Sequence, residues 1–240
     1  MQAVFIADTH IRKDPSDNRV IAAHLAKLDP ACWLVIAGDL TDNGFAAEYA
    51  EALRLLTPWK GRCVLAPGNH DCAGIHGLRW SEKAAARWAK FTQDMEAVGE
   101  LHLGEWLICA LDSVNSHTRI LELAQGELGE AELARAREMI QLGHQAGHKV
   151  CLTLHHNPVD DPRACVRRPL TDAESRFLNW AEKLRDSSEF LDLAYGGEGA
   201  DLIICGHTHM HMEWTATRGI PTHMISLGDF RGGEDSFFLG

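Results

Sequence analysis

Short, almost purely apolar runs recur along this chain, and most are followed by a cluster of polar residues. Several of these runs have the length and the residue types of β-strands. They lack the apolar–polar alternation of a strand with one solvated face, so we expect them inside sheets that are covered on both faces. The predicted strands are 3–7, 32–37, 63–66, 106–111, 150–154 and 202–205.

Longer stretches that favour helices lie between the apolar runs. Strands and helices that alternate along a chain indicate an α/β layered fold with parallel strands. The predicted helices are 19–28, 45–56, 81–98, 127–145 and 171–186.

The end of the chain has a different pattern. Segments 212–217, 222–227 and 236–239 are short and strand-like, with turn residues between them. We expect them to form an antiparallel sheet after the last helix. No internal repeat, low-complexity segment or linker-like shift in composition interrupts the chain, so a single domain over residues 1–240 is predicted.

Composition narrows the possible functions. The chain is 45% hydrophobic and 24% charged, which is typical of a globular domain, and its net charge is −11. Such an acidic balance argues against a broad basic surface for duplex nucleic acid. No apolar run reaches the roughly 18 residues of a membrane span, and none resembles a signal peptide. The 7 scattered cysteines favour reduced thiols and a cytoplasmic location, while nothing indicates an oligomeric state.

Polar side chains follow five of the predicted strands at the point where each strand ends. In open α/β sheets, ligands bind beyond the carboxyl ends of the strands, so these side chains should converge at one edge. The side chains are Asp8 and His10, Asp39, Asn69 with His70 and Asp71, His155 and His156, and His207 and His209.

These residue types indicate divalent metal ions. Carboxylate, imidazole and amide ligands suit Mn²⁺, Fe²⁺, Co²⁺ or Zn²⁺, with Mn²⁺ or Fe²⁺ favoured, whereas a structural zinc site would use cysteine. Asp8 and His10 are two residues apart, as are His207 and His209, so in extended segments each pair points the same way. The ligands are too many for one ion. Asp39 could bridge two ions about 3.5–4 Å apart, the arrangement that promotes in-line displacement at phosphorus.

Each residue also has an ordinary structural explanation. Asp39 follows Gly38 and could be a helix N-cap. Asn69 could be a turn residue, and a lone His10 could lie on the surface. Five such segments in order, each at a strand end, favour a shared site over five separate explanations.

Five motifs in the chain resemble the signature blocks of the calcineurin-like metallophosphoesterases. The resemblance implies a four-layer αββα sandwich of two mixed β-sheets flanked by helices, with two metal ions at the strand ends. The motifs are Asp8-x-His10, Gly38-Asp39, Gly68-Asn69-His70-Asp71, His156-x-Pro158 and Gly206-His207-x-His209.

The same resemblance implies roles for these residues. Asp8, His10 and His209 would hold one ion, while Asn69, His156 and His207 would hold the other. Asp39 would bridge both ions. His70 would be a catalytic residue beside the substrate, oriented by Asp71. Either His155 or His156 could be the ligand, and Pro158, two residues after His156, favours His156.

Other segments resemble one branch of that family. The segments 110–113, 126–128 and 155–158 look like those of bacterial class III cyclic-nucleotide phosphodiesterases. His70 stands where the lipid A pathway's pyrophosphate hydrolases have arginine, and Asp71 where protein serine/threonine phosphatases have glutamate. The resemblance implies an enzyme that hydrolyses a small phosphodiester by attack of a hydroxide held between two ions. Phosphomonoesterase, nuclease and non-catalytic binding module are the alternatives.

Overall fold

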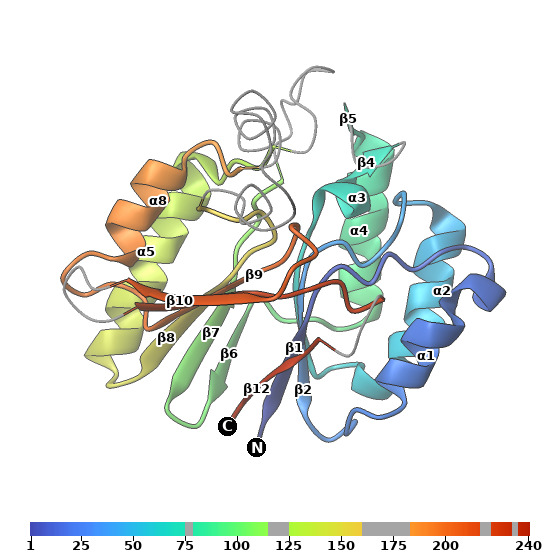
Figure 1. Cartoon of the computed structure of the whole chain (residues 1–240), viewed down its shortest axis with the longest axis horizontal. Helices are drawn as coiled ribbons and strands as arrows, with labels where there is room; N and C mark the ends of the chain where they lie inside the picture. The colour runs from blue at the N-terminus through green and yellow to red at the C-terminus, as the bar shows by residue number, and fades with distance from the viewer. Residues whose placement is uncertain (75–78, 115–124, 160–182, 217–221, 232–234) are drawn as a thin grey trace, which may run out of the picture.

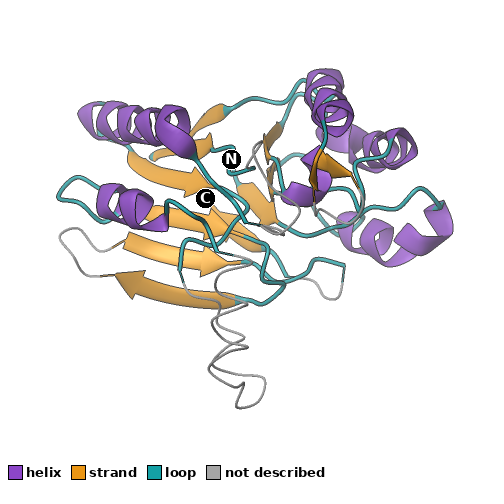
Figure 2. Cartoon of the chain, turned by 90° about the horizontal axis from the view of Figure 1, so that it is seen from above, coloured by secondary structure: helices purple, strands orange, loops and turns teal. Residues whose placement is uncertain are grey.

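Two β-sheets pack face to face, and helices cover the outer face of each sheet (Figure 1). The view from above shows helices on the two opposite sides of the strands (Figure 2). This computed structural model describes residues 1–74, 79–114, 125–159, 183–216, 222–231 and 235–240. The four-layer αββα sandwich predicted from the sequence is therefore confirmed.

The first sheet has the strand order β12-β1-β2-β3. Strands β1 (Ala3–Ile6), β2 (Trp33–Ala37) and β3 (Cys63–Ala66) are parallel. Strand β12 (Phe237–Leu239) pairs antiparallel with β1, with Ala3 opposite Leu239. The carboxyl ends of the three parallel strands therefore lie at one edge, towards the top of Figure 1.

The second sheet has the order β10-β11-β9-β8-β7-β6. Its four inner strands are parallel, and its two edge strands run antiparallel to their neighbours. The strands are β6 (Glu100–Leu103), β7 (Trp106–Ala110), β8 (Lys149–Thr153), β9 (Leu202–Cys205), β10 (Met212–Ala216) and β11 (Thr222–Ser226). A separate two-stranded hairpin joins β4 (Ala73–Gly74) to β5 (Arg79–Trp80).

Helices complete the two outer layers. The first sheet is covered by α1 (Arg19–Leu25), α2 (Ala46–Leu56) and α4 (Glu82–Asp94). The second sheet is covered by α5 (Gly129–Gln145) and α8 (Ser187–Ala194). Three short helices lie in the connections: η1 (Pro15–Asn18), η2 (Thr57–Trp59) and α3 (Asn69–Cys72).

Strand β1 shows why the apolar runs are continuous. Val4 and Ile6 pack against the helices, while Ala3 and Phe5 face the second sheet, and all four are fully buried. Successive side chains of a strand point to opposite faces, so a strand buried on both faces is apolar at every position. The described cysteines agree with this pattern, because they are buried with free thiols: Cys32, Cys63, Cys72, Cys109, Cys151 and Cys205.

Two sequence-based predictions need correction. The last strands do not form a separate antiparallel sheet: β11 pairs parallel with β9, and β12 joins β1 in the other sheet. The sequence of each strand is compatible with several partners, and packing of the two sheets decides among them. Most of the predicted helix 171–186 lies outside the described residues, residues 183–186 are not helical, and the helix α8 that follows was not predicted.

Strand β6 was also missed. Its residues alternate between exposed and buried, as expected for an edge strand that contains Glu100 and His102.

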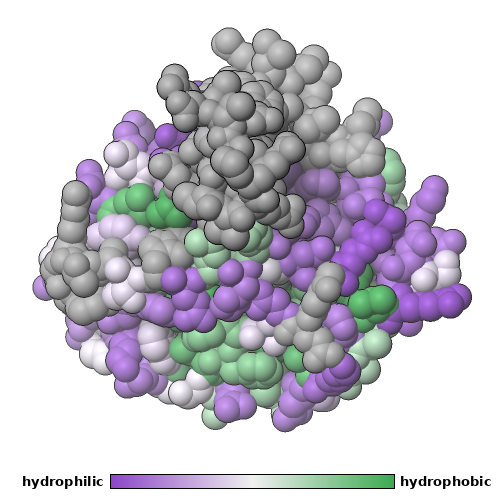
Figure 3. All heavy atoms as spheres, in the orientation of Figure 1, coloured by the Kyte–Doolittle hydropathy of each residue, from purple (hydrophilic) through white to green (hydrophobic). Residues whose placement is uncertain are grey.

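On the face of the molecule seen in Figure 3, hydrophobic residues gather below the centre, around the strands, and hydrophilic residues predominate around the periphery. No helix among the described residues has the length and apolar character to cross a membrane.

Phe230 tests the packing between the first sheet and α1. Its ring is 1% exposed and meets the ring of His24 edge-on at 5.6 Å. We expect Phe230→Ala to lower the free energy of unfolding by about 3–5 kcal/mol, because the truncation leaves a cavity in the core. Phe238 is 52% exposed, so Phe238→Ala should cost below about 1 kcal/mol. Urea unfolding of both variants measures the difference, and equal losses would contradict this account of the core.

Candidate metal centre

The backbone turns sharply where the polar side chains follow β1, β2 and β9. Asp8, His10, Asp39, His207 and His209 have positive φ values of 53°, 45°, 50°, 73° and 56°. Left-handed backbone is unfavourable for residues with a Cβ and is concentrated at functional sites. The sequence argument assumed that the pairs Asp8/His10 and His207/His209 lie in extended segments, and the positive φ values contradict this. Asp8 and His10 still reach one cluster, whereas His207 and His209 reach two different ones.

The first group of side chains joins the ends of β1 and β9. His209 Nε2 lies 3.4 Å from Asp8 Oδ1 and 3.3 Å from His10 Nε2. His10 Nε2 in turn lies 3.7 Å from Asp39 Oδ2. The Asp8 carboxylate is completely buried, and the His10 side chain is 8% exposed. These nitrogen and oxygen atoms converge as the ligands of one cation would.

The second group surrounds the imidazole of His155. His155 Nε2 lies 3.1 Å from Asn69 Oδ1, 3.2 Å from Asp39 Oδ2 and 3.1 Å from His207 Nδ1. On its other side, Nδ1 lies 3.0 Å from the carbonyl of Ala37. A carbonyl only accepts, so it fixes the Nδ1 proton and directs Nε2 to the other side chains.

His156 reaches the same region from the opposite side. Its Nδ1 lies 2.9 Å from Ser113 Oγ, and its backbone N–H donates to the same hydroxyl at 3.2 Å. Its ligand atom lies within 4.8 Å of those of His155 and His207. Both adjacent histidines are fully buried, so both contribute to the cluster. Gly126 makes room for this arrangement, because a Cβ there would overlap the His156 ring.

His70 lies beside the first group. Its Nδ1 is 2.7 Å from the carbonyl of Asp42, which fixes the proton on Nδ1 and leaves Nε2 as the reactive nitrogen. The ring meets that of His10 edge-on, with the ring centres 4.7 Å apart. His70, His10 and Asp39 also place ligand atoms within 4.8 Å of one another.

Asp71 makes contacts that the sequence did not predict. Its buried carboxylate accepts hydrogen bonds from the backbone of Leu40, Thr41 and Gly68 and from the Thr41 hydroxyl, at 2.9–3.2 Å. The Asp42 carbonyl accepts a hydrogen bond from His70 Nδ1 and so orients the His70 ring. Burial and the nearby charge of Asp39 raise the pKa of Asp71 to about 6. Asp71 therefore holds the turn after β2 against the turn after β3.

The structure decides between the alternative explanations for Asp39 and Asn69. Asp39 is not a helix N-cap, since helix α2 begins at Ala46 and is preceded by Phe45. Asn69 is the first residue of the short helix α3, and its side chain points towards His155. Gly38 explains how the Asp39 turn fits: it has φ 84°, and a Cβ there would overlap the His155 ring.

Burial controls the charges of the cluster. Burial lowers the pKa of His10 to about 4, and burial with the nearby imidazoles lowers that of His207 well below its ordinary value. Both are therefore neutral at pH 7, the form that binds a metal. Although burial opposes the charged form of Asp39, the His155 and His70 imidazoles hold its pKa well below the usual range. Burial alone would lower the pKa of His155, but Asp39 raises it to about 9.

Two carboxylates beyond the predicted set contact the imidazoles of the first group. Asp42 Oδ1 lies 3.8 Å from His10 Nδ1, and Asp229 Oδ2 lies 3.8 Å from His209 Nδ1. Metal-ligating histidines commonly direct their second nitrogen to a carboxylate. Asp42 was visible in the polar cluster after the second predicted strand, whereas no motif marked Asp229.

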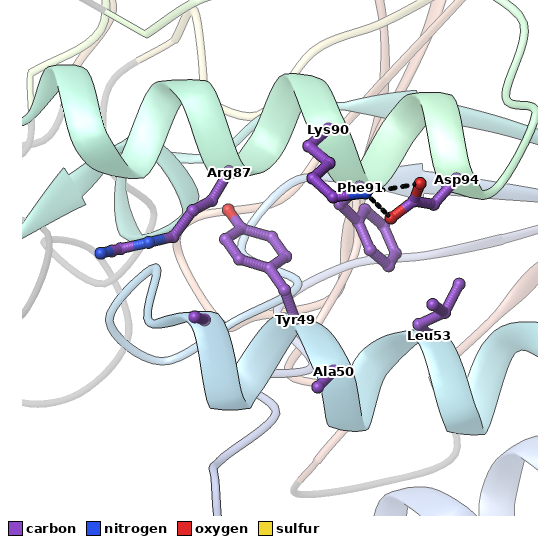
Figure 4. A pocket seen from close by; sticks show the side chains of 8 residues that line it. Tyr49, Ala50, Leu53, Arg87, Lys90, Phe91 and Asp94 are labelled. Atoms are coloured by element: carbon purple, nitrogen blue, oxygen red, sulfur yellow. Dashed lines mark hydrogen bonds and ion pairs between the residues drawn. The ribbon is translucent and has the colours of Figure 1, made fainter.

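A groove of about 250 Å³ lies apart from these side chains, between helices α2 and α4 (Figure 4). Tyr49 and Phe91 form its apolar wall, and the Lys90–Asp94 ion pair lies at one end. The Tyr49 hydroxyl donates to the backbone carbonyl of Asp71 at 2.7 Å. Through Tyr49 the groove borders helix α3, and its lining residues include none of the clustered Asp and His residues.

Comparison with known sequences gives the family. Residues 1–211 match the calcineurin-like phosphoesterase family. The 3',5'-cyclic adenosine monophosphate phosphodiesterase CpdA of Escherichia coli is 24% identical over 194 residues, 79% of this chain and 59% of CpdA. A probable cyclic nucleotide phosphodiesterase of Rhodococcus erythropolis is 28% identical over 199 residues, 80% of this chain and 56% of that protein. The chain thus spans less than two thirds of the length of these relatives.

Solved structures share the fold. A dimetal phosphatase from Danio rerio has a TM-score of 0.61 at 13% identity, with 99% of this chain and 91% of that chain covered. The phosphopantetheinyl hydrolase PptH of Mycobacterium tuberculosis has a TM-score of 0.56 at 14% identity, with 96% and 90% covered. Identities this low relate the folds and leave the substrates open.

The chemistry of the clustered side chains fits the metal centre of that family. The buried carboxylate and imidazole groups, whose ligand atoms lie within 4.8 Å of one another, match the ligand types of divalent ions. The family uses a dimetal centre, and its match covers most of the chain. The chain therefore belongs to the calcineurin-like phosphoesterase family.

Proposed function

We propose that this enzyme hydrolyses a phosphodiester, with cyclic nucleotides as the leading candidates, at a centre of two divalent ions. The observation that carries the proposal is the position of Asp39. Its Oδ2 lies 3.7 Å from His10 Nε2 in the first group and 3.2 Å from His155 Nε2 in the second. One carboxylate oxygen that borders both groups supports a bridging role between two ions.

The two groups would hold the ions in the following way. Asp8, His10 and His209 would bind the first ion with Asp39. Asn69, His207 and one of the adjacent histidines would bind the second ion, again with Asp39. Mixed carboxylate, imidazole and amide ligands favour Mn²⁺ or Fe²⁺.

We propose His155, and not the predicted His156, as the histidine ligand of the second ion. His155 Nε2 lies 3.1–3.2 Å from Asn69 and Asp39, which are proposed ligands of that ion. The Ala37 carbonyl holds the Nδ1 proton and so directs Nε2 at these groups, where a bound ion would displace the proton that Asp39 holds on the imidazole. His156 would then support the cluster from the side of Ser113.

Bound divalent ions would lower the pKa of a water molecule and neutralise the charge of the phosphoryl oxygens. The chain supplies the other requirements. Rigid strand ends keep the ligands in place, so little reorganisation accompanies the reaction. Water attacks phosphorus, the P–O bond to the leaving group breaks, and the leaving oxygen takes a proton. His70, in its imidazolium form, would donate that proton from Nε2, because the Asp42 carbonyl holds the proton on Nδ1.

Two observations support a diester over a monoester. The relatives from Escherichia coli and Rhodococcus erythropolis are both named as cyclic-nucleotide phosphodiesterases. The net charge of −11 also disfavours the second negative charge of a monoester.

A substrate panel tests the function. We expect metal-stripped enzyme refilled with Mn²⁺ to have a larger kcat/KM for bis(p-nitrophenyl) phosphate than for p-nitrophenyl phosphate, and to hydrolyse cyclic nucleotides. Single-stranded DNA tests the nuclease alternative. A monoester that is hydrolysed much faster than its matching diester would refute the proposed substrate class while leaving the metal centre intact.

The adjacent histidines provide a second test. We expect His155→Ala to lose one bound metal ion, because it removes a ligand and its contact with Asn69. His156→Ala should keep both ions. Elemental analysis of both folded variants, with circular dichroism as the folding control, decides between them. The opposite pattern would return the ligand role to His156.

The third test concerns proton donation by His70. We expect His70→Ala to keep both ions and to slow hydrolysis by roughly 10²–10⁴-fold for esters with alkyl leaving groups. The loss should be smaller for p-nitrophenyl esters, since nitrophenolate leaves without protonation. Equal losses would make His70 a stabiliser of charge and not the acid. A fall in metal content would make it a ligand, which its position near Asp39 also permits.

A further inference from the structure

Asp229 lies on the segment that connects β11 to the first sheet. The backbone around it is held at three points. Leu227 N–H donates to the Cys205 carbonyl at 2.8 Å, and Phe230 N–H donates to the Ala7 carbonyl at 3.3 Å. Asp229 Oδ1 accepts from the N–H of Arg231 at 2.7 Å. Its other oxygen, Oδ2, lies near the imidazole of His209.

That oxygen faces the imidazole of His209 on the side away from the centre. His209 Nε2 points to Asp8 and His10, at 3.4 and 3.3 Å, while His209 Nδ1 lies 3.8 Å from Asp229 Oδ2. The distance is that of an ion pair and exceeds a direct hydrogen bond. A small rotation of the ring would bring the two atoms within hydrogen-bond distance. Burial raises the pKa of Asp8, and the charges of Asp39 and Asp229 add to that effect.

We infer that Asp229 is a positioning residue that holds the imidazole of His209 with its Nδ1 protonated and its Nε2 directed at the first metal ion. The inference rests on the proposed role of His209 as a ligand. A carboxylate behind an imidazole fixes the tautomer and makes Nε2 a stronger electron donor, which increases metal affinity.

His209 needs such support more than the other proposed ligands of the first ion. Its side chain is 41% exposed, whereas those of Asp8 and His10 are 0% and 8% exposed. An exposed imidazole loses more rotational freedom when it binds an ion, and a fixed partner reduces that loss. In the second group, the Ala37 carbonyl and the Ser113 hydroxyl, both neutral, contact the imidazoles. The two ions would therefore be held by ligands of different donor strength.

Manganese binding to the full chain tests the inference. Free Mn²⁺ is measured by electron paramagnetic resonance during titration of the metal-stripped protein. We expect Asp229→Ala to weaken one of the two sites about 10–100-fold and to leave the other within about twofold. Asp229→Asn should weaken the same site less, because its amide oxygen still accepts from Nδ1. Metal-free Asp229→Ala should unfold at the temperature of the metal-free wild type, which excludes a general loss of structure.

A double-mutant comparison identifies the route of the effect. If Asp229 acts through His209, adding Asp229→Ala to a His209→Ala protein should have little further effect. The affinity of the first site should fall by less than about twofold beyond the loss caused by His209→Ala alone. Glu213→Gln is the charge control: it removes one negative charge four residues from His209, where the carboxylate contacts His211 at 3.0 Å. It should leave both Mn²⁺ sites unchanged.

The outcomes separate this inference from the proposed function. Wild-type protein that binds fewer than two Mn²⁺ ions would overturn the two-ion centre itself. Two ions bound equally well by wild type and Asp229→Ala would overturn only the role of Asp229. Equal weakening by Glu213→Gln and Asp229→Ala would also overturn it, because the effect would then be a long-range effect of net charge.

Discussion

The buried carboxylate of Asp71 is the interaction on which the geometry of the metal centre depends. It accepts hydrogen bonds from Leu40, Thr41 and Gly68, and so joins the turn after β2 to the turn after β3. Those turns present Asp39 and Asn69. A buried carboxylate without these donors would be strongly unfavourable, so the turns and the carboxylate stabilise one another. The His70 N–H, which donates to Asp39 Oδ1 at 2.9 Å, adds a further link between the same two turns.

The centre also joins the two sheets. β1, β2 and β3 present residues from one sheet, while β8 and β9 present His155 and His207 from the other. The His207 N–H donates to Asp8 Oδ2 at 3.0 Å across this junction. Small residues between the sheets, such as Ala7 and Ala37, allow this close approach. Ligands drawn from both sheets make metal affinity depend on how the sheets pack.

The sequence was sufficient to predict the strands that are buried on both faces and the edge where polar residues gather, because such a strand is apolar throughout. It was insufficient where side-chain direction decides the role. The directions of the Asp8 and His10 side chains follow from left-handed backbone, which the pattern of apolar and polar residues does not predict. The different surroundings of His155 and His156 depend on Ala37 and Ser113, which are distant in sequence. Asp229 has no local signal, because only tertiary packing brings it to His209.

The pairing of β12 with β1 has a consequence for how the protein acquires its structure. Val4 lies opposite Phe238, so the first sheet gains its outer strand through a contact between segments that are far apart in the sequence. Contacts of large sequence separation form slowly, since a long loop must close first. During synthesis, β1 would leave the ribosome early and keep one unpaired edge until β12 follows. An open strand edge promotes association with other chains, so chaperones that shield such edges would matter most for this protein in that interval.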